Sequence, residues 1–439
     1  MPRICLLVGA AGSLSLTEAV TAARPIADPV LVLDRGELAA SPALAEVARS
    51  LATTVAVDMS DLAAVCECVA ASGAEAVAAF VDAYCPVVDE VNARLFGRVA
   101  VPGRWRKDVQ RELLVRHGVS RITNSPVRTA EELDRAIARH GLPVVVKPVS
   151  GVASRDVWLL RHPAELAAVP LDGDSVFVVE PYIRGPRRAR GPHRADYLSA
   201  ELFVTSAGTD GFLTDRPPLA APCRETGIIG PSTLDAAAQA AVLAKARAAH
   251  QALGLGSGAF HIEIKLTDAE PEVIEVNGRL GGYVSRLVRL GTGADLASVA
   301  IAAALDRPVL DRPVLDRPAP FRPQWRRHVA ALFLQAPMDA VLVAAAPGRR
   351  EIRRLPGVLA VDHITAAGTP LDWRAGTGAA AVKVWLAGDD DDELRVAMAS
   401  CARWLADAFD FRDARGQRAR DDDWLAGLAK AGLAKGCGG

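Results

Sequence analysis

The sequence has no long hydrophobic run and no excess of one charge. No uninterrupted apolar stretch approaches the roughly 18 residues of a membrane-spanning helix. Lysine and arginine number 51 and aspartate and glutamate number 52, which gives no basis for a nucleic-acid partner. We therefore expect neither a membrane nor a nucleic acid as a partner.

Cysteines are scattered and form no CxxC pair, which implies neither a zinc site nor a disulfide framework. They are Cys5, Cys66, Cys68, Cys85, Cys223, Cys401 and Cys437. A signal peptide is disfavoured, because Ile4–Val8 followed by a Gly-Ala-Ala-Gly-Ser turn is more typical of a first strand. We expect a protein of the reducing cytoplasm.

The chain of 439 residues has the length of two to four domains. Residues 3–102 alternate short apolar strands with alanine-rich helices, which predicts a parallel doubly wound sheet. Residues 305–320 contain the tetrapeptide LDRP three times, and proline at that density predicts an extended linker. Strands and a helix follow, so we expect a C-terminal α+β domain over residues 321–439.

Two short segments late in the chain alternate apolar and polar residues. They are 260–266, with the sequence FHIEIKL, and 273–277, with the sequence VIEVN. Period-two alternation predicts half-buried strands. The residues between them, 267–271, have turn chemistry, so the pair is predicted to form a β-hairpin.

The register of this hairpin brings acidic side chains together. If the turn is centred on Ala269, Glu263 lies opposite Glu275 and His261 lies opposite Asn277. Two carboxylates and an amide oxygen on one face suit a hard cation, Mg²⁺ or Mn²⁺. The alternative interpretation is a solvated polar face on an edge hairpin.

A second segment, residues 143–160, predicts strand, loop and strand. Lys147 ends the first strand, and the small residues of the loop 148–155 let backbone N–H groups approach phosphate oxygens. The lysine would add a point charge beside them. The segment is no P-loop, since GxxxxGK[ST] is absent. An ordinary hairpin with an exposed lysine is the alternative.

The order of these parts resembles the ATP-grasp superfamily of carboxylate–amine ligases. Lys107 opens a helix, Lys147 precedes the small-residue loop, VVEPYI spans 178–183, and HIE and EVNGRLGG begin at His261 and Glu275. Within the superfamily the motifs are most similar to the L-amino-acid ligase branch, whose members form dipeptides. The resemblance spans roughly residues 105–300.

The resemblance implies an α/β protein with the ATP-grasp fold. Residues 1–102 would be a Rossmann-like N-terminal domain with a doubly wound parallel sheet. Residues 103–304 would be the two-part ATP-grasp domain, with a lid subdomain over about 106–180. The linker and the C-terminal α+β domain would follow.

The resemblance also implies which residues hold ATP. Lys107 and Lys147 would hold the α- and β-phosphates, and residues 150–155 would be a mobile loop in which Ser154 donates to phosphate. This loop has one glycine where the family usually has two or three. Lys107 precedes Asp108, whereas the family often has the reverse order.

Adenine and ribose would be held by the next part of the chain. Glu180 would accept from the adenine amino group, and the backbone of Tyr182 and Ile183 would line the adenine edge. The family usually has an acid for the ribose hydroxyls shortly afterwards, where residues 185–187 here read Gly-Pro-Arg. Asp196 is our candidate for that role.

The hairpin and the residues after it would carry the chemistry. The resemblance implies one or two Mg²⁺ ions held by Glu263, Glu275 and Asn277. Arg279 would hold the substrate carboxylate or the acyl-phosphate, and the N–H groups of Gly281 and Gly282 would stabilise the oxyanion. Lys147, Arg279 and Gly282 are thus the predicted catalytic residues.

The implied activity is the formation of an amide from a carboxylate and an amine, through an acyl-phosphate, with release of ADP and phosphate. Amino-acid-like substrates are expected. The alternatives are an ATP-grasp ligase or carboxylase for another metabolite, and a non-catalytic nucleotide-binding protein. Ligases of this type are often dimeric, so a homodimer is compatible with the resemblance.

Overall fold

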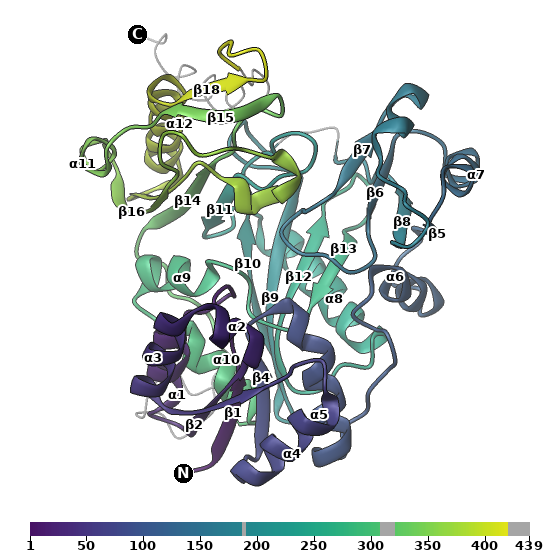
Figure 1. Ribbon diagram of the computed structural model, residues 1–439, viewed down its shortest axis with the longest axis vertical. Coiled ribbons are helices and arrows are strands. Elements are labelled where there is room, and N and C mark those ends of the chain that lie inside the picture. The colour runs from purple at the N-terminus through teal and green to yellow at the C-terminus, as the bar shows by residue number, and fades with distance from the viewer. Residues whose placement is uncertain (187–189, 308–320, 420–439) are drawn as a thin grey trace.

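The computed structural model describes residues 1–186, 190–307 and 321–419, and Figure 1 shows the chain. Most of the expected linker, residues 187–189 and the last twenty residues lie outside the described part. No helix of the described part is long and apolar enough to cross a membrane.

The N-terminal part is a parallel sheet covered on both faces, as predicted. Its strand order is β3-β2-β1-β4. The strands are β1 (Arg3–Leu7), β2 (Asp28–Asp34), β3 (Thr53–Val57) and β4 (Ala76–Ala79). Its helices are α1 (Leu16–Ala23), α2 (Arg35–Ala40), α3 (Pro42–Leu51), α4 (Leu62–Ser72) and α5 (Cys85–Phe96), with a 3₁₀ turn η1 (Asp82–Tyr84) before α5.

Both faces of these strands are apolar, which is why the strands read as continuous hydrophobic runs. Cys5 and Leu7 pack with α4 and α5, whereas Ile4 and Leu6 pack with α1 and with a helix from much later in the chain, α10 (Leu296–Ala304). The N-terminal sheet is therefore joined to the rest of the molecule through a shared core.

A small antiparallel sheet of order β5-β8-β6-β7 forms the part that Figure 1 shows at the upper right. Its strands are β5 (Ser125–Val127), β6 (Val144–Pro148), β7 (Trp158–Leu160) and β8 (Phe177–Pro181). Its helical segments are α6 (Lys107–Arg116), α7 (Ala130–His140) and η2 (Pro163–Ala168). The predicted strands at Lys147 are present as β6 and β7.

The largest sheet has eight antiparallel strands in the order β13-β12-β9-β10-β11-β14-β17-β16. They are β9 (Tyr197–Thr205), β10 (Gly208–Asp215), β11 (Gly227–Gly230), β12 (Gly258–Lys265), β13 (Glu272–Asn277), β14 (His328–Leu334), β16 (Val358–Ile364) and β17 (Val382–Gly388). This sheet runs across residue 321, because β14 pairs with β11. The boundary expected there stays a prediction.

Helices cover both faces of the large sheet. They are α8 (Ala236–Ala252) on one face, α9 (Val284–Thr292) and α10 on the other, and α12 (Asp391–Ala408) over β14 and β17. Alternation along β14 serves both sides: Phe333 packs toward α9 and Leu332 toward α12. The remaining elements are α11 (Arg349–Ile352), the 3₁₀ segment η3 (Trp373–Ala379) and the pair β15 (Ala340–Ala345) and β18 (Asp410–Asp413).

A local signal predicted where α12 begins. We interpret the acidic run Asp389–Asp392 as the start of a helix rather than a metal site. The Asp390 side chain accepts from the Glu393 N–H at 2.8 Å and caps α12, which confirms that interpretation.

Candidate active site

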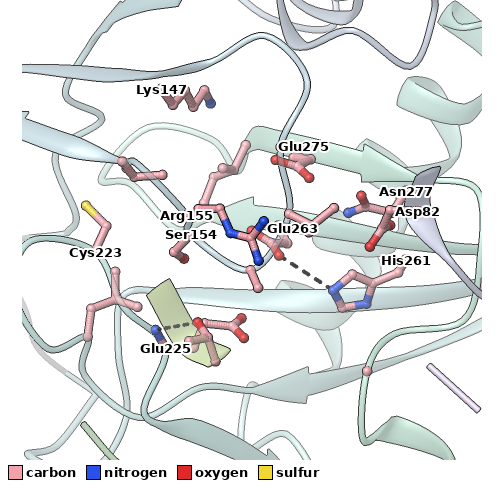
Figure 2. A pocket seen from close by; sticks show the side chains of 18 of the residues that line it. Asp82, Lys147, Ser154, Arg155, Cys223, Glu225, His261, Glu263, Glu275 and Asn277 are labelled. Atoms are coloured by element: carbon pink, nitrogen blue, oxygen red, sulfur yellow. Dashed lines mark hydrogen bonds and ion pairs between the residues drawn. The ribbon is translucent and has the colours of Figure 1, made fainter. Parts of the chain in front are cut away.

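A cavity of about 520 Å³ lies where the N-terminal part, the small sheet and the large sheet meet. It opens on the face of the large sheet opposite α8. Isoleucines of β12, Ile262 and Ile264, pack toward α8, so the alternating His261 and Glu263 face the cavity. Figure 2 shows several of the lining side chains, with Glu263, Glu275 and Asn277 gathered on one side.

The predicted hairpin register is confirmed where it bears on the site. Glu263 lies opposite Glu275 and His261 lies opposite Asn277. A β-bulge follows between Glu263 and Ile264, and it was not predicted. The bulge changes which side chains of β13 face the core and which face the cavity. Val273 is buried in the core under α8, whereas Ile274 lines the cavity.

Two cationic side chains offset the opposed carboxylates. Lys107 Nζ lies 2.6 Å from Glu275 Oε2 and also donates to the Gly151 carbonyl at 3.2 Å. His261 Nε2 lies 3.7 Å from Glu263 Oε1. Burial by itself would raise the pKa of Glu263, but His261, with Arg216 and Lys107, lowers that pKa to about 2. Glu263 is therefore ionised at neutral pH.

His261 is held by a buried acid behind it. Burial would lower the pKa of His261, but the charge of Glu201 raises it to about 9. Glu201 is fully buried. One of its carboxylate oxygens holds the His261 ring, and the other accepts from the Gly281 N–H at 3.0 Å. This contact corrects one expectation, because the Gly281 N–H already donates to Glu201 and is not open to a substrate oxyanion. Gly282 lines the cavity.

The acidic side chains fit a divalent ion carried by a nucleotide. Within the described residues no three His, Cys, Asp or Glu side chains form a metal cluster of their own. Magnesium usually takes only one or two protein carboxylates and completes its coordination with phosphates and water. Glu263 and Glu275, with side chains 25% and 20% exposed, meet that requirement, and Asn277 adds an amide beside them.

Asn277 also links the hairpin to the N-terminal part. With its amide nitrogen turned toward the acids, it donates to Glu275 Oε1 at 3.0 Å and to Asp82 Oδ1 at 3.3 Å. Figure 2 shows Asp82 next to Asn277. Asp82 also pairs with Arg279, whose Nε lies 2.7 Å from Asp82 Oδ1. Arg279 is thus held at the cavity by an acid that follows β4.

Lys147 lies across the cavity from the hairpin in a buried charge network. Its Nζ is 2.8 Å from Glu180 Oε2, and Arg111 Nε donates to Glu180 Oε1 at 2.8 Å. Burial would raise the pKa of Glu180, but Arg111 and Lys147 lower it to about 2. Both oxygens of Glu180 are therefore engaged, while Tyr182 and Ile183 line the cavity just beyond. The adenine contacts stay predictions.

Asp196, our ribose candidate, is not among the side chains that line the cavity. It lies directly behind Lys265, whose Nζ is 2.6 Å from Asp196 Oδ1 and 5.3 Å from the centre of the Tyr182 ring. Lys265 lines the cavity beside Tyr182. The structure thus places Asp196 at the edge of the predicted nucleoside region, and its role stays a prediction.

The small-residue loop after Lys147 lies over the cavity, and Ser154 and Arg155 line it. Ala153, Ser154 and Asp156 have positive φ angles of 56°, 55° and 51°. Non-glycine residues adopt this left-handed conformation at a cost of roughly 1 kcal/mol or more each. Contacts between the loop and other segments of the chain must therefore stabilise this conformation.

Motif analysis missed several residues at the far end of the cavity. Glu225 and Arg216 form a loose pair there, with Glu225 Oε1 3.7 Å from Arg216 Nε. Burial raises the pKa of Glu225, Arg216 opposes that effect, and Glu263 adds to it. Lys383 donates to the Tyr283 hydroxyl and lies against two aromatic rings, 4.9 Å from the Tyr283 centroid and 5.5 Å from that of Phe333.

A general rule could have found Asp82, but no local signal marks the others. Asp82 follows the carboxyl end of a parallel strand, where ligand sites of open α/β sheets lie. Lys383 comes more than a hundred residues after the hairpin and belongs to no motif. Only the pairing of β14 and β17, which sets Lys383 opposite Phe333, brings it to the cavity.

No protein-family model matches the chain. It is 34% identical over 203 residues to the uncharacterised protein y4rH of Sinorhizobium fredii, which covers 45% of this chain and 41% of that protein. It is 32% identical over 179 residues to carnosine synthase 1 of Gallus gallus, covering 40% and 17%, and 27% identical over 203 residues to alanine–anticapsin ligase of Bacillus subtilis, covering 40% and 41%. The chain therefore spans less than half the length of these relatives.

Solved structures match nearly the whole chain. The L-amino acid ligase of Bacillus licheniformis superposes with a TM-score of 0.68 at 18% identity, covering 94% of this chain and 98% of that one. An ATP complex of carboxyaminoimidazole ribonucleotide synthase from Aspergillus clavatus gives 0.65 at 16% identity, covering 93% and 99%. These likenesses establish the fold that the motifs predicted.

Proposed function

We propose that this chain, which has the fold of ATP-grasp enzymes, is an ATP-dependent carboxylate–amine ligase of that superfamily. It would phosphorylate a carboxylate to an acyl-phosphate, which an amine then attacks to give an amide, ADP and phosphate. The observation that carries the proposal is the opposed pair Glu263 and Glu275, which shares a cavity with Lys147 and Arg279.

Phosphoryl transfer depends mainly on positioning and on neutralising charge. We propose that Lys107 and Lys147 hold the phosphates and that Glu263, Glu275 and Asn277 hold Mg²⁺, which would neutralise phosphate charge. Lys107 already spans the two halves of such a site, because its Nζ contacts both Glu275 and the Gly151 carbonyl of the loop.

Arg279 would bind the substrate carboxylate and then the acyl-phosphate. Its side chain is mostly buried and is oriented by Asp82. Burial would lower the pKa of Arg279, but the charge of Asp82 outweighs burial and raises that pKa. A guanidinium that is both charged and fixed in direction suits the planar carboxylate of a substrate. The neighbouring Gly282 N–H is the remaining candidate for the oxyanion.

We further propose that the amine substrate carries a carboxylate of its own, as an amino acid does. Four other cations of the cavity pair closely with acids: Lys107, Lys147, Lys265 and Arg279. No carboxylate of a described residue pairs with Lys383 or with Arg155, and of these two only Lys383 lies beside the Tyr283 hydroxyl. The Tyr283 hydroxyl accepts from Lys383, so its own hydrogen can be donated to a ligand. The ammonium and phenol together suit a carboxylate.

The test is release of ADP from ATP by the purified chain with Mg²⁺ and a panel of amino-acid pairs. We expect ADP and an amide only when a carboxylate and an amine substrate are both present. Turnover with other metabolites alone would favour the alternative ligase or carboxylase. ADP binding without any Mg²⁺-dependent ATP turnover would favour a non-catalytic nucleotide-binding protein.

A further inference from the structure

The loop over the cavity is held from the side opposite to the nucleotide motifs. The Thr377 N–H of η3 donates to the Ala153 carbonyl at 2.8 Å. In return, the Asp156 N–H donates to the Arg374 carbonyl at 3.2 Å. Both bonds join the loop to a segment that follows it by more than two hundred residues and that carries no nucleotide motif.

The two backbones meet so closely that only glycine fits at the contact. A Cβ on Gly376 would lie 2.1 Å from the Ala153 carbonyl oxygen and 2.8 Å from the Arg155 nitrogen. Gly376 also has a φ of 66°, which L side chains rarely adopt. The next glycine along, Gly378, meets nothing within 4 Å. The close approach is therefore specific to one position of η3.

Aromatic packing continues the contact beyond the loop. Trp158 of β7 and Trp373 of η3 meet edge to face with ring centroids 4.8 Å apart. The Arg374 guanidinium lies 5.5 Å from the Trp158 centroid and 5.1 Å from the Trp373 centroid. Thus η3 holds both ends of the segment that runs from Ala153 to Trp158.

Thr377 links the loop to the opposite wall of the cavity. It is buried, and its hydroxyl oxygen accepts from the Glu225 N–H at 3.3 Å while its own N–H holds Ala153. One residue of η3 thus bridges the loop that carries Ser154 and the wall that carries Glu225. Left-handed geometry at Ala153 and Ser154 explains why such support is needed.

We propose that η3 is a clamp that holds the small-residue loop, residues 150–155, closed over ATP. Gly376 and Thr377 would be positioning residues for Ser154. This inference rests on the proposed function, since the loop must bind phosphates. A loop that is held closed also keeps water from the acyl-phosphate, which water would otherwise hydrolyse. The clamp would thereby set both nucleotide affinity and the yield of amide per ATP.

The first test compares Gly376→Ala with Gly378→Ala as the matched control on the same segment. We expect Gly376→Ala to raise the KM for ATP roughly tenfold, because it costs the loop a hydrogen bond and its packing. It should also raise the ratio of ADP released to amide formed. Gly378→Ala should leave both quantities at parental values.

Hydrogen exchange gives a readout that does not depend on turnover. Amides of residues 153–158 and 373–377 should exchange slowly in the parental chain with ADP and Mg²⁺, and faster in Gly376→Ala, with unchanged exchange in the N-terminal sheet. If Gly376→Ala does not fold, Trp373→Ala should loosen the same amides and Trp373→Phe should restore them.

Two results would be distinguishable failures. If the parental chain binds no ADP, the proposed function is overturned and the clamp with it. If the chain binds ADP but the Gly376 and Gly378 variants share one KM, one ADP-to-amide ratio and one exchange pattern, the clamp alone is overturned.

Discussion

Replacing Lys147 by methionine tests the nucleotide site most directly. Methionine keeps much of the aliphatic length of the buried side chain, which is 8% exposed, and removes its charge. A hydrogen bond from a charged group contributes about 1.5–3 kcal/mol, so the variant should bind nucleotide about 10- to 150-fold more weakly. The fold should survive, because Arg111 still donates to Glu180 at 2.8 Å.

Calorimetric titration with ADP in the presence of Mg²⁺ measures this loss. Thermal unfolding of the same sample should show a cooperative transition, lowered by the unpaired half of Glu180 but still well above the assay temperature. The control is Lys245→Met, which removes a lysine paired with Glu270 at 2.9 Å outside the cavity. If Lys147→Met binds ADP as tightly as Lys245→Met does, Lys147 does not hold the phosphates.

Three further predictions follow from the same geometry. Glu275→Gln should lower the rate of amide formation at least about 100-fold in the ADP-release assay with the fold intact, because a carboxylate that would hold Mg²⁺ beside the phosphates is lost; a parental rate would remove Glu275 from the metal site. Lys383→Met should raise the KM of amines that bear a carboxylate about tenfold or more but leave their carboxamide analogues unchanged; equal changes for both would argue against a carboxylate contact. Burial would raise the pKa of Glu180, but Arg111 and Lys147 lower that pKa from 4.5 to about 2 in the folded state. The ionised Glu180 therefore contributes fully to the free energy of unfolding above about pH 4.5, and this contribution is lost as the pH falls toward 2. Chemical unfolding across that window should show a flatter acid limb for Glu180→Gln, and identical limbs would contradict the assignment.

Local pattern sufficed for the hairpin and for the start of α12. The pairing of Glu263 with Glu275 follows from alternation and from the centre of the turn, both of which lie within about fifteen residues. Likewise α12 begins directly after the side-chain cap Asp390, as the acidic run 389–392 indicated. The bulge, which leaves Ile274 of β13 without a partner in the ladder, escaped prediction, because an extra residue leaves no mark in a short alternating run.

Local sequence pattern did not predict contacts between segments that are distant along the chain. Arg279 was expected to face a substrate, but its partner Asp82 lies 197 residues earlier. Gly281 was expected to donate to an oxyanion, but Glu201 of β9 accepts its N–H. Neither partner is marked by a motif, since each depends on how β4 and β9 come to lie beside the hairpin.

The amino-acid sequence alone predicted the opposed acids and the lysine before the small-residue loop, because each of these features is short-range. Their order along the chain resembles the ATP-grasp superfamily, and that resemblance implied the chemistry of the cavity. Tertiary structure decided which cation neutralises which acid, which N–H remains open to a substrate, and that η3 touches the loop at Gly376. Those outcomes depend on the packing of segments that lie from 80 to more than 200 residues apart. Such packing is determined by the summed burial and hydrogen bonding of the whole chain rather than by any local pattern.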